Sequence, residues 1–143
     1  MINNIICGWK HKALGLLLVR LALGGAFLYH GYGKLMDMEG TISFFSSLGF
    51  NSFLAYVVAI VETVGGVAII LGIGTGLAGI LLAIVMVVAI LKVKLPNGGI
   101  TKAEIDLVLL ALSLGIIFTG PGKYSLHDKF CKNCNCLPET PKV

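Results

Sequence analysis

The chain has 143 residues, of which 57% are hydrophobic and 13% are charged, and its net charge is +4. A soluble domain carries about 25% charged residues, and a mean hydropathy of +0.94 over the whole chain leaves too little polar sequence to cover an apolar core. These values exclude a soluble globular protein, a disordered chain and a coiled coil, and they predict one domain surrounded by a lipid bilayer.

The first two apolar runs cover residues 13–33 and 53–73. Each is long enough to cross roughly 30 Å of hydrocarbon as a helix. The first run contains Arg20 and lacks an A-x-A-like site, so it is predicted to remain as a span and not to be cleaved as a signal peptide. The second run carries Glu62 almost at its midpoint.

The third and fourth apolar runs cover residues 77–91 and 105–119. A glycine-rich turn without charges separates the second run from the third, which predicts a helical hairpin. Period-two alternation, typical of membrane strands, is absent from all four runs. The sequence therefore predicts an all-α, membrane-spanning four-helix bundle over residues 13–122, preceded by a segment of residues 1–12 and followed by a tail of residues 123–143.

Lysines flank the four runs and predict the orientation of the chain. An even number of spans puts both termini on one side, together with six lysines, whereas four lysines fall on the other side. This bias predicts a multi-pass protein of the plasma membrane with its N-terminal segment and tail in the cytoplasm. Because the basic residues are scattered and not clustered, nucleic acid is not an expected partner.

Charged groups within the spans predict a polar interior. A charge at the bilayer centre costs about 2.5–3.5 kcal/mol, so it needs a partner or a cavity. Small residues recur beside these charges at helical spacing, which predicts four inward faces. The first three consist of Arg20, Gly24, Phe27, Gly31 and Lys34; of Ala55, Ala59, Glu62, Gly66 and Ile69; and of Gly79, Ala83 and Met86, while the fourth consists of Glu104, Val108, Ala111 and Gly115.

Two hypotheses account for this interior. In the first, Arg20 and Glu62 neutralise each other and hold two helices together. In the second, a polar pocket binds an anionic or quinone-like head group and passes protons; its predicted residues are Arg20, His30, Lys34, Glu62 and Glu104. Asp106 lies near the start of the fourth run and is assigned to stabilisation of that helix end.

Three cysteines, Cys131, Cys134 and Cys136, form a C-x-x-C-x-C pattern in the tail. Thiolates at this spacing bind a metal, form a disulfide or stay as inert thiols, and the spacing alone does not choose among these. A structural zinc site would need a fourth ligand, for which Cys7 and His127 are candidates.

The polar and glycine residues also resemble a known family in their order along the chain. They are Arg20, the stretch 31–35 (GYGKL), Glu62 with Gly65 and Gly66, Leu71 with Gly72, Met86, and the stretch 120–126 (GPGKYSL). This order, from about Gly15 to Asp128, resembles the DoxX family of small four-helix membrane proteins.

The resemblance implies a bundle associated with oxidoreductase systems, such as a thiosulfate:quinone oxidoreductase or redox-protective enzymes. It implies family roles for Arg20, Lys34 and Glu62 and for a motif of Gly31, Gly120, Gly122, Ser125 and Asp128. The usual Ser-Leu-Asp ending is Ser-Leu-His-Asp here, which leaves the role of Asp128 open.

The leading hypothesis is a DoxX-like membrane subunit that supports a membrane oxidoreductase or redox-protective complex, either as a non-catalytic partner or as an enzyme. Its polar interior is expected to bind a quinone or an anionic small molecule. Expected partners are the lipid bilayer and other membrane redox proteins. The sequence does not decide whether the chain forms a homo-oligomer. The alternatives are a proton-coupled small-molecule transporter that uses Glu62 and a thiol oxidoreductase that uses Cys131 and Cys134.

Overall fold

A computed structural model describes residues 12–122 and 124–126 of the chain. Over these residues the protein is helical, which confirms the predicted all-α class. The elements are α2 (Lys12–Met36), α3 (Met38–Ser47), α4 (Ser52–Leu71), α5 (Thr75–Ala89), the π-helix η1 (Ile90–Lys94), the short α6 (Leu95–Gly98), the 3-10 helix η2 (Ile100–Ala103) and α7 (Glu104–Thr119).

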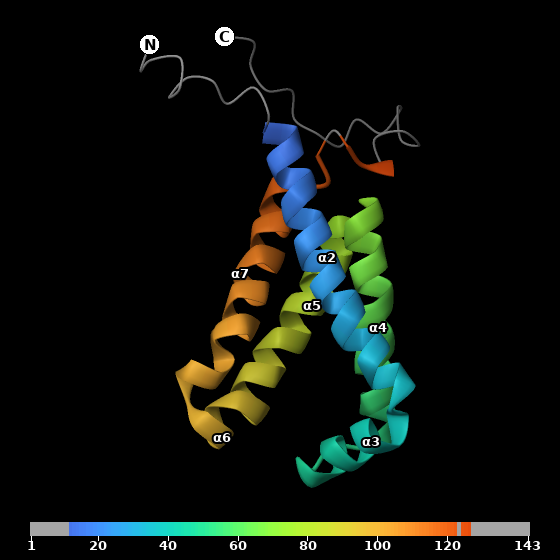
Figure 1. Cartoon of the computed structure of the whole chain (residues 1–143), viewed down its shortest axis with the longest axis vertical. Helices are drawn as coiled ribbons and strands as arrows, with labels where there is room; N and C mark the ends of the chain where they lie inside the picture. The colour runs from blue at the N-terminus through green and yellow to red at the C-terminus, as the bar shows by residue number, and fades with distance from the viewer. Residues whose placement is uncertain (1–11, 123, 127–143) are drawn as a thin grey trace.

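The long helices α2, α4, α5 and α7 form the body of the molecule (Figure 1). Helix α2 packs along α4, α5 packs along α7, and α4 also contacts α5. The first turn of α2 and the last turn of α7 lie at the same end of the bundle, as the prediction of an even number of spans requires. Helices α3 and α6 lie at the opposite end, where the two pairs of long helices diverge (Figure 1).

Local sequence explains where α3 and α4 begin and end. The Asp37 side chain accepts a hydrogen bond from the backbone N–H of Gly40 and starts α3, and the Asn51 side chain accepts one from Phe53 and starts α4. Helix α4 ends at Gly72, whose φ of 74° places it in the left-handed region that favours glycine. Helix α3 was not predicted, because it is short and lies between two apolar runs.

Three helical segments are long and apolar enough to cross a membrane: Ala13–Met36, Ser52–Leu71 and Thr75–Lys94. Large apolar side chains such as Leu18, Val64 and Phe118 are exposed on the outside of the bundle. Lipid is the solvent that suits such a surface, so this is a membrane protein. Helix α7 has 16 residues and packs against α5, and its crossing of the bilayer stays a prediction.

The inward faces predicted for the first three runs are confirmed. Arg20, Gly24, Phe27 and Gly31 of α2 are buried, as are all five predicted residues of α4 and all three of α5, and Lys34 is half-buried. The face predicted for the fourth run was wrong: Glu104, Val108, Ala111 and Gly115 are exposed, and α7 buries Leu109, Ser113 and Ile116 instead. Helix α7 is apolar on most sides, so the pattern of its residues does not single out one inward face.

Glycines let α2 and α4 approach closely. A Cβ atom added to Gly24 would lie 2.6 Å from Ile70 Cγ1 and 2.7 Å from the carbonyl oxygen of Gly66. A Cβ atom added to Gly66 would lie 2.8 Å from the carbonyl oxygen of Gly24. The two glycines therefore face each other, and there is no room for a side chain at either position.

Adjacent glycines of α2 provide a matched test of this contact. Gly24→Ala is expected to cost about 1–3 kcal/mol of stability, because the added methyl group must push backbone atoms apart. Gly25→Ala has open space around the new Cβ atom, so it is expected to be neutral or to stabilise by up to about 1 kcal/mol. The midpoint of thermal unfolding in detergent micelles measures both, and equal midpoints for the two variants would contradict the close approach.

Candidate functional site

Two charged side chains, Arg20 and Glu62, are almost completely buried, with exposed fractions of 1% and 2%. They do not pair with each other. Among the described residues, Arg20 donates four hydrogen bonds, all to backbone carbonyl groups, and Glu62 pairs with Lys34. The predicted neutralisation of Arg20 by Glu62 was therefore wrong, although both side chains point into the bundle as predicted.

Arg20 joins three segments near the end of the bundle where α4 and α7 finish. Its Nε and Nη2 atoms donate to the carbonyl oxygens of Ile69 and Ile70 at 2.9 and 2.8 Å. Its Nη1 atom donates to the carbonyl oxygens of Pro121 and Tyr124 at 2.7 and 3.1 Å. The last carbonyl groups of a helix lack partners within the helix and carry partial negative charge, so a guanidinium group is a suitable cap.

The Arg20 side chain fits against the end of α4 only because the residue after that helix, Gly72, has no side chain. A Cβ atom added to Gly72 would collide with Arg20 Nη2 and lie 2.6 Å from Ser125 Cβ. Ser125 is itself buried beside this turn. Through these hydrogen bonds Arg20 connects α2 with α4 and with the segment after α7. Arg20 was predicted to lie in the polar pocket, but it is not among the residues that line the cavity described below.

Lys34 and Glu62 form an ion pair between α2 and α4. The Lys34 side chain is 28% exposed, whereas Glu62 is buried. Gly31, one turn before Lys34, allows this approach, since a Cβ atom there would lie 2.6 Å from the backbone nitrogen of Thr63. The ammonium group of Lys34 thus supplies the compensating charge that a buried carboxylate requires.

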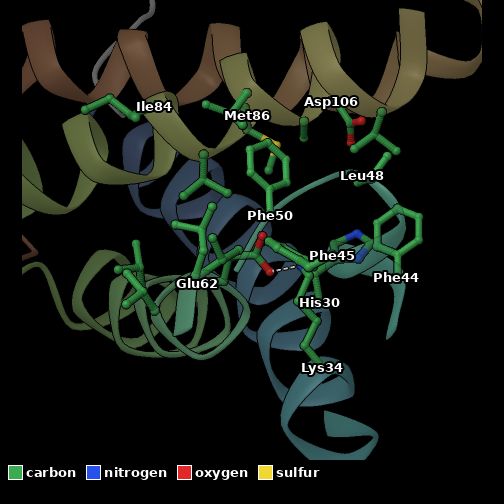
Figure 2. Close-up of a pocket in the computed structure, with 18 of the residues that line it drawn as sticks. His30, Lys34, Phe44, Phe45, Leu48, Phe50, Glu62, Ile84, Met86 and Asp106 are labelled. Atoms are coloured by element: carbon green, nitrogen blue, oxygen red, sulfur yellow. Dashed lines mark hydrogen bonds and ion pairs between the residues drawn. The ribbon is translucent and has the colours of Figure 1, made fainter. Parts of the chain in front are cut away.

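A cavity of about 420 Å³ lies beside this ion pair. Figure 2 shows His30, Lys34 and Glu62 on its wall, and His30, which is otherwise exposed, also contacts the ring of Tyr29 edge to face. Most of the wall is apolar and comes from α4 and α5, with α3 and the loop that follows it closing one side through Phe44, Phe45, Leu48 and Phe50. The volume and the apolar lining suit a small organic molecule.

A second polar pair lies on the wall of the same cavity. Lys94, the last residue of the π-helix η1, and Asp106, in the first turn of α7, are both lining residues. Lys94 Nζ lies 3.8 Å from Asp106 Oδ2. A π-helical turn is rare and often occurs at functional sites. The position of Asp106 near the helix start agrees with its assigned role at the helix end, but its presence in the cavity was missed.

The remaining predicted site residues lie elsewhere. Glu104 is exposed and is not among the residues that line the cavity. Gly120 and Gly122 have φ of 71° and 70° and shape the turn after α7 toward Arg20. Asp128 and the cysteines Cys131, Cys134 and Cys136 lie outside the described residues, as do Cys7 and His127. Within residues 12–122 and 124–126, no group of three or more potential ligands could hold a metal ion.

The cavity residues that the sequence did not indicate include apolar residues of α4 and α5 and also residues of α3, η1 and the start of α7. Asp37 and Asn51 are helix-capping residues on either side of two adjacent phenylalanines, and this pattern was the available signal for α3. For Lys94 and Asp106, the short connection between the third and fourth runs was the available signal that they would lie at the same end of the bundle.

Comparison with known proteins identifies the family. The DoxX family profile matches residues 15–95, which include Arg20, Gly31, Lys34 and Glu62. The chain is 43% identical over 111 residues to a protein named "Putative oxidoreductase CatD" from Bacillus subtilis (strain 168), covering 78% of this chain and 83% of the relative. No solved structure gives a significant match. The profile match and the relative together show that the chain belongs to the DoxX family.

Proposed function

We propose that this protein is a membrane subunit that binds a quinone-type molecule in its cavity and supports a membrane oxidoreductase or a redox-protective complex. The name of the Bacillus subtilis relative supports an association with oxidoreduction. The observation that carries the proposal is the largely apolar cavity of about 420 Å³ with the Lys34–Glu62 ion pair on its wall.

The chemistry of a quinone head group matches this wall. Its ring is flat and apolar, and its carbonyl oxygens accept hydrogen bonds. Lys34 and His30 offer N–H groups at the cavity, and the Glu62 carboxylate next to Lys34 can accept a proton from a reduced ring. The proposed role is to bind and orient this molecule, while a partner protein supplies the electrons.

We place the protein in the plasma membrane with residues 1–12 and 123–143 in the cytoplasm. In this orientation the cavity lies toward the outer side, because α3 and α6 are at the end opposite the first turn of α2 (Figure 1). The partners would be other membrane redox proteins. The transporter hypothesis gains no support from Glu62, since its pairing with Lys34 already accounts for a charge at that position.

Photolabelling of the full chain in lipid nanodiscs tests the proposal. An azide-substituted benzoquinone is expected to label peptides that line the cavity, and an excess of duroquinone (tetramethylbenzoquinone) is expected to compete. Val61→Phe should reduce labelling at least about fivefold, because Val61 lines the cavity and a larger side chain fills it.

Val64→Phe is the matched control for this substitution. It makes the same change on the same helix, but Val64 is 60% exposed on the outer face, so labelling should stay at the level of the unmodified chain. Labelling spread evenly over lipid-facing residues, or equal labelling in the two variants, would contradict a quinone site in the cavity.

A further inference from the structure

One carboxylate oxygen of Asp106, on the cavity wall, is buried without a hydrogen-bond donor among the described residues. The Asp106 side chain is 14% exposed, and its Oδ2 atom is buried. Within the part of the chain that the structure describes, no donor lies within hydrogen-bond distance of this atom. Lys94 Nζ, at 3.8 Å, is close enough to balance the charge but too far to donate.

A buried carboxylate oxygen without a donor is costly, because it has lost its hydrogen bonds to water and gained none in return. A molecule in the cavity can supply the missing O–H or N–H group. A carbonyl oxygen cannot, since it would bring its own lone pairs against those of the carboxylate.

The two polar places on the cavity wall are separated by apolar side chains. Figure 2 shows Asp106 and Met86 in the upper part of the view and Glu62, His30 and Lys34 in the lower part, with Phe50 at a level between them. A ring with one polar group at each of two opposite edges matches this arrangement. At Lys34 and His30 such a group meets donors, whereas at Asp106 it meets an acceptor.

We infer that the cavity selects the reduced, hydroxyl-bearing form of a quinone-type molecule, with one phenolic O–H donated to Asp106 Oδ2. The inference rests on the proposed function of the cavity and adds to it the redox state of the ligand and the residue that discriminates. A phenolic oxygen both donates and accepts, so the same ring can also accept a hydrogen bond from Lys34 or His30.

Equilibrium binding of two probes to the full chain in nanodiscs, without oxygen and with empty nanodiscs as the blank, tests the inference. Duroquinol is expected to bind about tenfold more tightly than duroquinone, since one hydrogen bond to a charged group is worth about that factor. The dimethyl ether of duroquinol has the same ring without O–H groups, and its affinity should be no higher than that of duroquinone.

Two variants locate the preference. Asp106→Asn replaces one acceptor oxygen by a donor and is expected to abolish or reverse the preference for duroquinol. Glu104→Gln makes the same change in the same turn of α7, but Glu104 is exposed and does not line the cavity, so the preference should persist.

The outcomes separate this inference from the proposed function. If neither probe binds above the blank, the quinone site itself is contradicted. If both probes bind equally, if the ether binds as tightly as duroquinol, or if Asp106→Asn keeps the preference, the cavity still binds quinones but the role of Asp106 is overturned. Should Asp106→Asn fail to fold, the comparison of duroquinol with its ether in the unmodified chain still tests the requirement for an O–H group, and equal affinities for the two would overturn the inference.

Discussion

Arg20→Met is expected to lower the free energy of unfolding by more than about 3 kcal/mol. The substitution removes the donor to four backbone carbonyl oxygens, on Ile69, Ile70, Pro121 and Tyr124. The Ile69 oxygen keeps a hydrogen bond from the backbone N–H of Gly72, whereas a buried or partly buried acceptor that is left without a partner costs about 1–3 kcal/mol. The midpoint of thermal unfolding in detergent micelles and the yield of monodisperse protein measure the effect.

Arg20→Lys is expected to recover only part of this stability. A lysine ammonium is a compact charge with three donors, whereas the guanidinium fork reaches two separate groups of carbonyls at once. Arg20 is the single arginine of the chain and the other ten cations are lysines, which fits a position where only the fork suffices. Lys92→Met, the loss of an exposed cation, is the control for charge alone; full stability of Arg20→Lys would contradict the role of the fork.

Lys34→Met is expected to cost about 3 kcal/mol of stability, because it leaves the buried Glu62 carboxylate without its counter-charge. This stability loss is at the lower end of the range of about 3–5 kcal/mol for breaking a buried ion pair, because the Lys34 side chain is partly exposed. Thermal unfolding in micelles again measures the loss.

The double variant Lys34→Met/Glu62→Leu is expected to recover most of that stability, because replacing both members of a buried pair by apolar groups is often neutral. In the photolabelling experiment, however, duroquinone should no longer reduce the labelling of this double variant, because the polar side chains that would hold the quinone are absent. Additive stability losses in the double-variant cycle would contradict the pairing, and retained quinone competition would contradict the part of the pair in binding.

The two buried charges therefore perform separate tasks at different levels of the bundle. Arg20 caps α4 and fastens the segment after α7, while Glu62 is balanced by Lys34 next to the cavity. The close contact of α2 with α4 through Gly24 and Gly66 connects these two places. Substitutions at Arg20 should thus act on stability, whereas changes at the cavity wall can be tested for binding in protein that still folds.

Helical periodicity predicted the inward faces of α2, α4 and α5 because small residues and single charges stand out in an otherwise apolar run. The same argument failed for α7. There the charged residues Glu104 and Asp106 lie in the first turn of the helix, where a charge can reach water, so the position of Glu104 carried no information about which side faces the bundle.

Hydropathy and charge alone determined that this chain is helical and lies in a membrane, because these depend on the free energy of transferring each side chain into lipid, which is a local property. The tertiary structure decided which charges meet. Burial forces every charged group to find compensation, but the nearest partner, whether Lys34 for Glu62 or backbone carbonyls for Arg20, depends on how far along its helix each residue lies relative to its neighbours. The cavity likewise exists only through packing, since α3, η1 and α7 contribute residues that are distant in the sequence.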